Sequence, residues 1–118
     1  MAGTIKKGGP RALTVTYTTD LLQGGAGGAI SGGSALIYDV LRHIHVMNKA
    51  AADTFRMYLG ASAGNAAGTE LYFDYPVGAK LAVDFYMATK LTSTDFIVGG
   101  AATTLTEVVT FDLEEYVV

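Results

Sequence analysis

The 118-residue sequence contains no cysteine, no tryptophan and only two prolines. Without cysteine the fold cannot depend on disulfides or on thiolate metal sites, so the packing of a core or of a partner must hold it together. Only 16% of the residues are charged, yet no apolar run approaches the roughly 20 residues of a membrane helix. The first residues also lack the apolar segment of a signal peptide. We therefore expect neither a membrane span nor a secretion signal.

The hydrophobic fraction is high for a chain with so little charge. Half of the residues are hydrophobic, and a chain of this length forms one domain that can bury one core. Apolar surface beyond what one small domain covers is typical of a subunit of an assembly. We expect a homo-oligomer, and specifically a trimer. The alternative is a core rich in alanine and glycine, whose side chains contribute little burial.

Charge is distributed unevenly along the chain. Residues 1–11 hold Lys6, Lys7 and Arg11 and no acid, whereas the remaining chain holds five basic and eleven acidic residues, a net charge of −6. The glycines and the proline of this segment oppose regular structure, so it is expected to be a flexible basic arm that orders only against a partner. The sequence thus divides into an arm, residues 1–11, and one folded domain, residues 12–118.

Side chains that alternate with period two predict that the domain is all-β. Strands are expected at Ala12–Thr18, Leu36–Asn48, Asp53–Leu59, Glu70–Tyr75, Lys80–Met87, Phe96–Val98 and about Thr104–Glu114. Glycine-rich loops are expected at Gln23–Ser34 and Gly60–Gly68. Seven to eight short strands with almost no helical periodicity indicate an antiparallel β-sandwich or jelly roll.

The most apolar stretch, Leu36 to Leu59, is expected to form a central hairpin around the turn Lys49–Ala52. A second hairpin is expected around the turn Pro76–Ala79. A helix over Val40–Met47 is an alternative that its β-branched residues disfavour. In an uninterrupted first strand, Ile44 and Val46 share one face, and Asp39, Leu41, His43, His45 and Met47 share the other.

Two histidines and one aspartate are the strongest candidates for chemistry. His43 and His45 lie two residues apart and could share a metal with Asp39, but zinc sites need three or four convergent ligands with further support. We expect instead an interface pair, and no metal or other cofactor. The chain offers four serines and no activated nucleophile, Glu114 and Glu115 point to opposite faces, and the glycine-rich loop fits no phosphate-binding motif. An enzyme is therefore not expected.

The acidic domain also argues against nucleic acid as a partner, because Arg42 and Arg56 are isolated and the arm alone offers too little positive charge. The seven tyrosines are typical of protein interfaces, and they could equally stack on sugars. We assign His43, His45, Tyr58, Tyr72 and Tyr86 to a subunit interface, and we keep a carbohydrate-binding module as an alternative.

The segment from Val40 to Gly60 resembles small β-sandwich structural proteins of tailed bacteriophages. It carries an arginine, Arg42, then an Ile-x-Val-x-Asn strand, Ile44 to Asn48, a small-residue turn and an alternating strand. The later turn and strand Thr94–Val98 fit the same pattern, and the likeness covers about residues 36–113. Such proteins serve as capsid decoration proteins, head fibres and tail components.

This resemblance implies a non-enzymatic virion protein. Together with the arm and the small size, it favours a decoration, or cement, protein on the outer capsid surface, whose partner is the major capsid protein. The arm residues Ile5, Lys6, Lys7 and Arg11 are the expected contacts, through pairing with the sheet edge of a neighbour. A tail or head-to-tail component is the alternative within this class.

Overall fold

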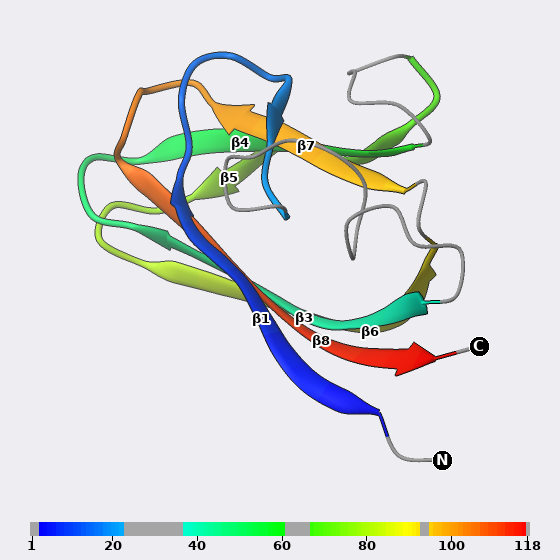
Figure 1. The fold of residues 1–118 in the computed structure, drawn as a ribbon. Helices are drawn as coiled ribbons and strands as arrows, with labels where there is room; N and C mark the ends of the chain where they lie inside the picture. Colours follow the sequence, from blue (N-terminus) through cyan, green and yellow to red (C-terminus); the bar gives the residue numbers. More distant parts are fainter. Residues whose placement is uncertain (1–2, 23–36, 61–66, 93–94, 118) are drawn as a thin grey trace.

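The fold is known from a computed structural model that describes residues 3–22, 37–60, 67–92 and 95–117. Its eight strands are β1 (Thr4–Ala12), β2 (Thr19–Asp20), β3 (Ile37–Asn48), β4 (Asp53–Gly60), β5 (Glu70–Val77), β6 (Ala82–Leu91), β7 (Phe96–Ala101) and β8 (Glu107–Val117). They form two four-stranded antiparallel sheets packed as a sandwich (Figure 1). The predicted fold class is confirmed. No helix of the described residues is long and apolar enough to cross a membrane.

The strand order is that of a jelly roll. Sheet A has the order β1-β8-β3-β6, and sheet B has the order β2-β7-β4-β5. The first strand therefore pairs with the last, the second with the seventh, the third with the sixth and the fourth with the fifth, as in a long antiparallel hairpin rolled into two sheets. Among the described strands, only β4 and β5 follow each other within one sheet.

Both predicted hairpins are wrong, because each proposed turn carries the chain from one sheet to the other. Strand β3 belongs to sheet A and β4 to sheet B, and β5 and β6 are divided in the same way. The buried Asn48 holds both corners together. Its Nδ2 donates to the carbonyl oxygens of Ala51 at 2.8 Å and of Val77 and Gly78 at 3.2 Å, and its Oδ1 accepts from the Ala50 nitrogen at 3.1 Å. The asparagine thus stabilises two neighbouring connections between the sheets.

Residues 4–11 of the predicted flexible arm belong to the edge strand β1 instead. They pair with β8 from Thr4 opposite Glu115 to Ala12 opposite Val108, with an irregularity between Gly8 and Arg11. Intrinsic propensity is overridden here, because the partner strand lies in the same chain and supplies the backbone hydrogen bonds. The strand predicted at Ala12–Thr18 is absent: residues 13–18 connect the sheets, and Leu13 is buried in the core.

Strand β3 contains a β-bulge that changes which residues face the core. Its pairing with β8 skips one residue between Leu41 and His43. Asp39 and Leu41 are buried before this bulge, and Ile44, Val46 and Asn48 are buried after it. The predicted alternation is therefore correct before Arg42 and after it, but the face that points to the core changes at Arg42. Such an extra residue reverses the inward and outward positions of the rest of the strand.

The core lies between the sheets and is closed on one side by residues that precede and follow β2. Its largest members are Phe55, Phe111, Leu13, Leu21, Leu41, Ile44, Met57, Leu91, Ile97 and Leu113. Strand β7 continues through Gly99 and Gly100, beyond the predicted end of the strand at Val98. A Cβ on Gly100 would lie 2.5 Å from the Thr14 oxygen and 2.6 Å from the Thr16 oxygen. Glycine is needed at this position because the 13–18 connection passes directly over the strand.

The predicted glycine-rich loop at 23–34, most of the loop at 60–68, and the turn residues Ser93 and Thr94 lie outside the described residues. Strand β8 begins at Glu107 and continues to Val117, later at both ends than the predicted 104–114. Leu105, at the start of the predicted strand, is 53% exposed and has a positive φ of 61°.

Candidate functional site

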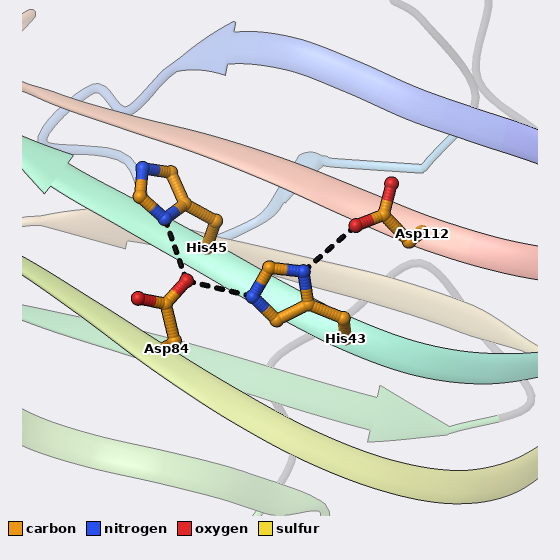
Figure 2. Close-up of polar contacts among 4 residues, drawn as sticks. All are labelled: His43, His45, Asp84 and Asp112. Atoms are coloured by element: carbon orange, nitrogen blue, oxygen red, sulfur yellow. Dashed lines mark hydrogen bonds and ion pairs between the residues drawn. The ribbon is translucent and has the colours of Figure 1, made fainter.

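The outer face of sheet A carries a cluster of two histidines and two aspartates. His43 and His45 come from β3, Asp84 comes from β6 on one side, and Asp112 comes from β8 on the other side (Figure 2). We call these four residues the His–Asp cluster. Three strands of one sheet hold it, so its geometry depends on the sheet and not on a loop.

The strand register brings these four residues together. His45 is paired with Asp84, and His43 lies between Asp112 of β8 and Tyr86 of β6. The bulge at Arg42 is the decisive feature, because it places both histidines on the outer face while Leu41 remains in the core. Without this extra residue, His43 and His45 would share the inward face of Leu41.

The contacts within the cluster are short. The two nitrogens of His43 lie 2.7 Å from carboxylate oxygens: Nδ1 from Asp112 Oδ2, and Nε2 from Asp84 Oδ1. His45 Nδ1 lies 2.7 Å from the same Asp84 Oδ1. Carboxylates only accept hydrogen bonds, so both nitrogens of His43 donate when the ring is protonated. Asp84 Oδ1 is thus the point on which both imidazoles converge (Figure 2).

These contacts shift the pKa values of two groups in opposite directions. The pKa of His43 is raised, chiefly by its hydrogen bond to Asp112 and further by Asp84, against an opposing effect of burial. The pKa of Asp84 is lowered, chiefly by its hydrogen bond to His45 and then by that to His43. Both shifts favour the charged form of the group, as expected when opposite charges share hydrogen bonds.

Aromatic and ionic contacts surround the His–Asp cluster. The ring of Tyr86 stacks on His43 with centroids 4.5 Å apart and planes 6° apart, and 78% of Tyr86 is exposed. Further along β3, Arg42 Nε donates to Glu114 Oε1 at 2.9 Å. The Tyr116 hydroxyl donates to Glu114 Oε2 at 3.0 Å. Large aromatic surface and satisfied charges therefore lie side by side on this face.

The predicted interface residues divide into three environments. His43, His45 and Tyr86 lie together on the outer face of sheet A. Tyr72 lies half-buried between the sheets, where its ring stacks on Phe85 with centroids 4.1 Å apart. Tyr58 is only 3% exposed and offers a partner almost no surface in this structure. The alternation of the sequence indicates strands but does not show which tyrosines the second sheet covers.

The predicted arm contacts are divided as well. Ile5 is 75% exposed and Lys7 is exposed, so both are accessible on β1. Lys6 points inward instead, with Nζ 2.9 Å from Glu115 Oε1 and 3.3 Å from Asp39 Oδ2. Burial lowers the pKa of Lys6, but these two carboxylates outweigh it and raise the value. Lys6 therefore stabilises the sandwich, and Arg11 is partly buried.

The third metal ligand suggested by the sequence is wrong. Asp39 is buried on the opposite side of β3 from the histidines, beside Lys6. The third ligand beside the two histidines is instead Asp84 of the neighbouring strand β6. No short motif could reveal this residue, since it is 39 positions from His45 and its place depends on the pairing of β3 with β6.

No protein-family model and no curated protein matches the sequence. The four serines considered as nucleophiles lie outside the described residues, so the expectation that the chain is not an enzyme stays a prediction. The resemblance to phage sandwich proteins likewise rests on the sequence pattern alone.

Proposed function

We propose that the chain is a non-enzymatic structural protein of a tailed-phage virion, and specifically a decoration protein bound to the outer capsid surface. The observation that carries the proposal is the outer face of sheet A, where Ile5, Met47 and Tyr86 are exposed among satisfied ion pairs. Aromatic and apolar side chains bordered by charges are the composition of protein interfaces.

The fold supports this proposal by analogy. Eight-stranded jelly rolls are found in viral capsid proteins and also in lectins. A fold does not determine a function, so the argument depends on the surface and on the sequence pattern of Val40 to Gly60. Two strands at the ends of sheet A, β1 and β6, offer edges to which a neighbour could add a strand.

The N-terminal residues are proposed to bind a neighbour as an edge strand and not as a flexible arm. Strand β1 already pairs with β8, so its affinity for a neighbour comes from its other edge and from the exposed Ile5 and Lys7. Lys6 is already engaged in ion pairs with Asp39 and Glu115, so we do not assign it this role. Exposed ion pairs add only about 0–1 kcal/mol each, so backbone pairing and Ile5 supply most of the binding.

Self-association into a trimer is tested by light scattering of the purified chain at micromolar concentration. The variant Ile5→Ser combined with Tyr86→Ser is expected to be monomeric and folded, because both side chains are exposed. Leu105→Asn is the matched control, since it removes an exposed apolar side chain outside sheet A, and asparagine tolerates a positive φ. A wild-type chain that stays monomeric contradicts self-association.

Location in the virion is tested on purified particles of the phage that encodes the chain. We expect mass spectrometry to detect the chain in many copies per particle, and electron microscopy to show density on the head that is lost when the gene is deleted. Particles that lack the chain contradict the virion proposal. Density on the tail instead supports the head-to-tail or tail alternative.

A carbohydrate-binding module is the second candidate, favoured by the exposed ring of Tyr86 beside two histidines and two carboxylates. Aromatic rings stack on sugars, and carboxylates accept hydrogen bonds from their hydroxyl groups. A glycan at 100 times its dissociation constant should stabilise the chain by about 2.7 kcal/mol. A glycan-dependent rise in melting temperature that Tyr86→Ser abolishes favours this candidate over the decoration protein.

A further inference from the structure

Three ligand atoms of the His–Asp cluster point at one another from two strands. His43 Nε2, His45 Nδ1 and a carboxylate oxygen of Asp84 all lie within 4.8 Å of one another. Two imidazole nitrogens and a carboxylate are a donor set typical of zinc sites, where metal–ligand distances are about 2.0–2.2 Å. Asp84 Oδ1 lies 2.7 Å from both nitrogens, and its side chain is partly exposed, so it is free to move outward and admit an ion.

Asp112 provides the support that such a site requires. Its Oδ2 lies 2.7 Å from His43 Nδ1, the nitrogen that faces away from Asp84. A neutral His43 that donates from Nδ1 to Asp112 leaves the lone pair of Nε2 directed at the position of the ion. Metal-binding histidines in proteins usually donate their second nitrogen to a carboxylate in this way.

The ring of His43 is further fixed by the parallel ring of Tyr86, whose centroid lies 4.5 Å away. The ligands also stand on paired strands, which hold side chains more accurately than loops do. The site is therefore organised before any ion binds.

Charge also favours a cation at this position. With neutral histidines, the cluster carries the two negative charges of Asp84 and Asp112, and a divalent ion would balance both. The side chains of His45 and Asp84 are 39% and 38% exposed. Solvent therefore reaches the cluster, and a water molecule or a group of another molecule could complete the coordination.

We infer that His43, His45 and Asp84 form a binding site for a divalent transition-metal ion, with Zn²⁺ as the first candidate, and that Asp112 orients His43 within it. Bound metal would link the edge strand β6 to β3. The inference does not depend on the proposed virion function, because it rests on the cluster alone.

The test is calorimetric titration of the tag-free, metal-stripped chain with ZnCl₂, since a polyhistidine tag would itself bind the ion. We expect one Zn²⁺ per chain and a rise in melting temperature on binding. Co²⁺ should give the visible absorption bands of a low-coordinate nitrogen and oxygen site, and the NMR signals of both histidines of the chain should shift with saturation. Mg²⁺ should not compete, because it prefers oxygen ligands in octahedral geometry.

Variants separate the ligands from their support. Asp112→Asn is expected to weaken Zn²⁺ binding 10–100-fold, and His45→Ala and Asp84→Asn to weaken it at least as much. Asp74→Asn is the matched control: Asp74 is also an exposed acid in an ion pair, with Arg56 on sheet B, and its loss should leave Zn²⁺ affinity unchanged. Circular dichroism establishes that each variant is folded.

Two results would overturn the inference. The first is the absence of Zn²⁺ binding by the folded wild-type chain at millimolar concentration, which would make the cluster a set of structural ion pairs only. The second is binding that the His43→Ala and His45→Ala double variant retains at wild-type affinity, which would place the ion elsewhere.

Discussion

The buried carboxyl group of Glu107 should make the stability of the chain depend on pH. Glu107 begins β8 and is fully buried, and its backbone oxygen accepts a hydrogen bond from the Leu13 nitrogen at 2.8 Å. Burial, together with the nearby Asp53 carboxylate, raises the pKa of Glu107 from 4.5 to about 8. The side chain is therefore mainly protonated at neutral pH in the folded state.

The direction of the effect follows from the two states. Between pH 4.5 and about 8 the folded chain keeps this proton and the unfolded chain releases it. The contribution of Glu107 to the free energy of unfolding is thus greatest at low pH and falls as the pH rises through this range. The pKa difference sets a ceiling of about 5 kcal/mol for the loss, and relaxation of the carboxylate toward water reduces the expected loss to about 2–3 kcal/mol.

Glu107→Gln isolates this contribution, because glutamine has a similar shape and does not titrate. Urea unfolding is followed by circular dichroism from about pH 5 to about pH 9, and the free energy of unfolding of the variant is compared with that of the wild type at each pH. We expect the difference to change by about 2–3 kcal/mol in favour of glutamine across this range. Glu70→Gln, at an exposed position of β5, is the control and should give a constant difference. A constant difference for Glu107→Gln as well would refute the reasoning.

Two further substitutions, both measured by urea unfolding, test the connections held by Asn48 and the close contact between β7 and the 13–18 connection. Asn48→Ala should cost about 2–4 kcal/mol of stability, because it removes four hydrogen bonds of a buried amide that joins two connections between the sheets. A loss below about 1 kcal/mol would contradict the role of Asn48. Gly100→Ala should cost about 1–3 kcal/mol or more, because its Cβ would lie 2.5 Å from the Thr14 oxygen. Gly60→Ala, whose Cβ would lie 3.3 Å from the Thr69 methyl group, should cost less, and an equal cost would exclude the steric explanation.

The fold class could be predicted from the sequence because alternation reports locally on each strand. The positions of β3, β4, β5 and β6 deviate from the prediction by a few residues at most. The partner of each strand could not be predicted, since a short turn serves equally well for a hairpin and for a crossing between sheets. Asn48 is visible in the sequence as the end of an apolar strand, but its bonds to Val77 and Gly78 depend on a chain segment about 30 residues away.

For the N-terminal strand, the sequence failed to predict the strand itself. Glycine and proline at residues 3–10 indicate a low intrinsic tendency to form regular structure, but pairing with β8 overrides it. Asp39 could have been a signal for this strand. It is a charged residue in an apolar strand, and a buried carboxylate needs a partner such as the inward-facing Lys6. Burial raises the pKa of Asp39, and Lys6 only partly offsets this effect.

The bulge at Arg42 links the core to the His–Asp cluster. An uninterrupted β3 could bury either Leu41 or the pair Ile44 and Val46, but not all three, and each exposed side chain would forfeit about 1.5–3 kcal/mol. Keeping Leu41 inward would also place His43 and His45 in the core, away from Asp84 and Asp112. One extra residue resolves both conflicts, since all three aliphatic side chains are buried and both imidazoles face the carboxylates. The residue pattern that makes β3 ambiguous as a sequence is therefore the pattern that a bulged strand requires, with apolar residues on both faces and a change of face at Arg42.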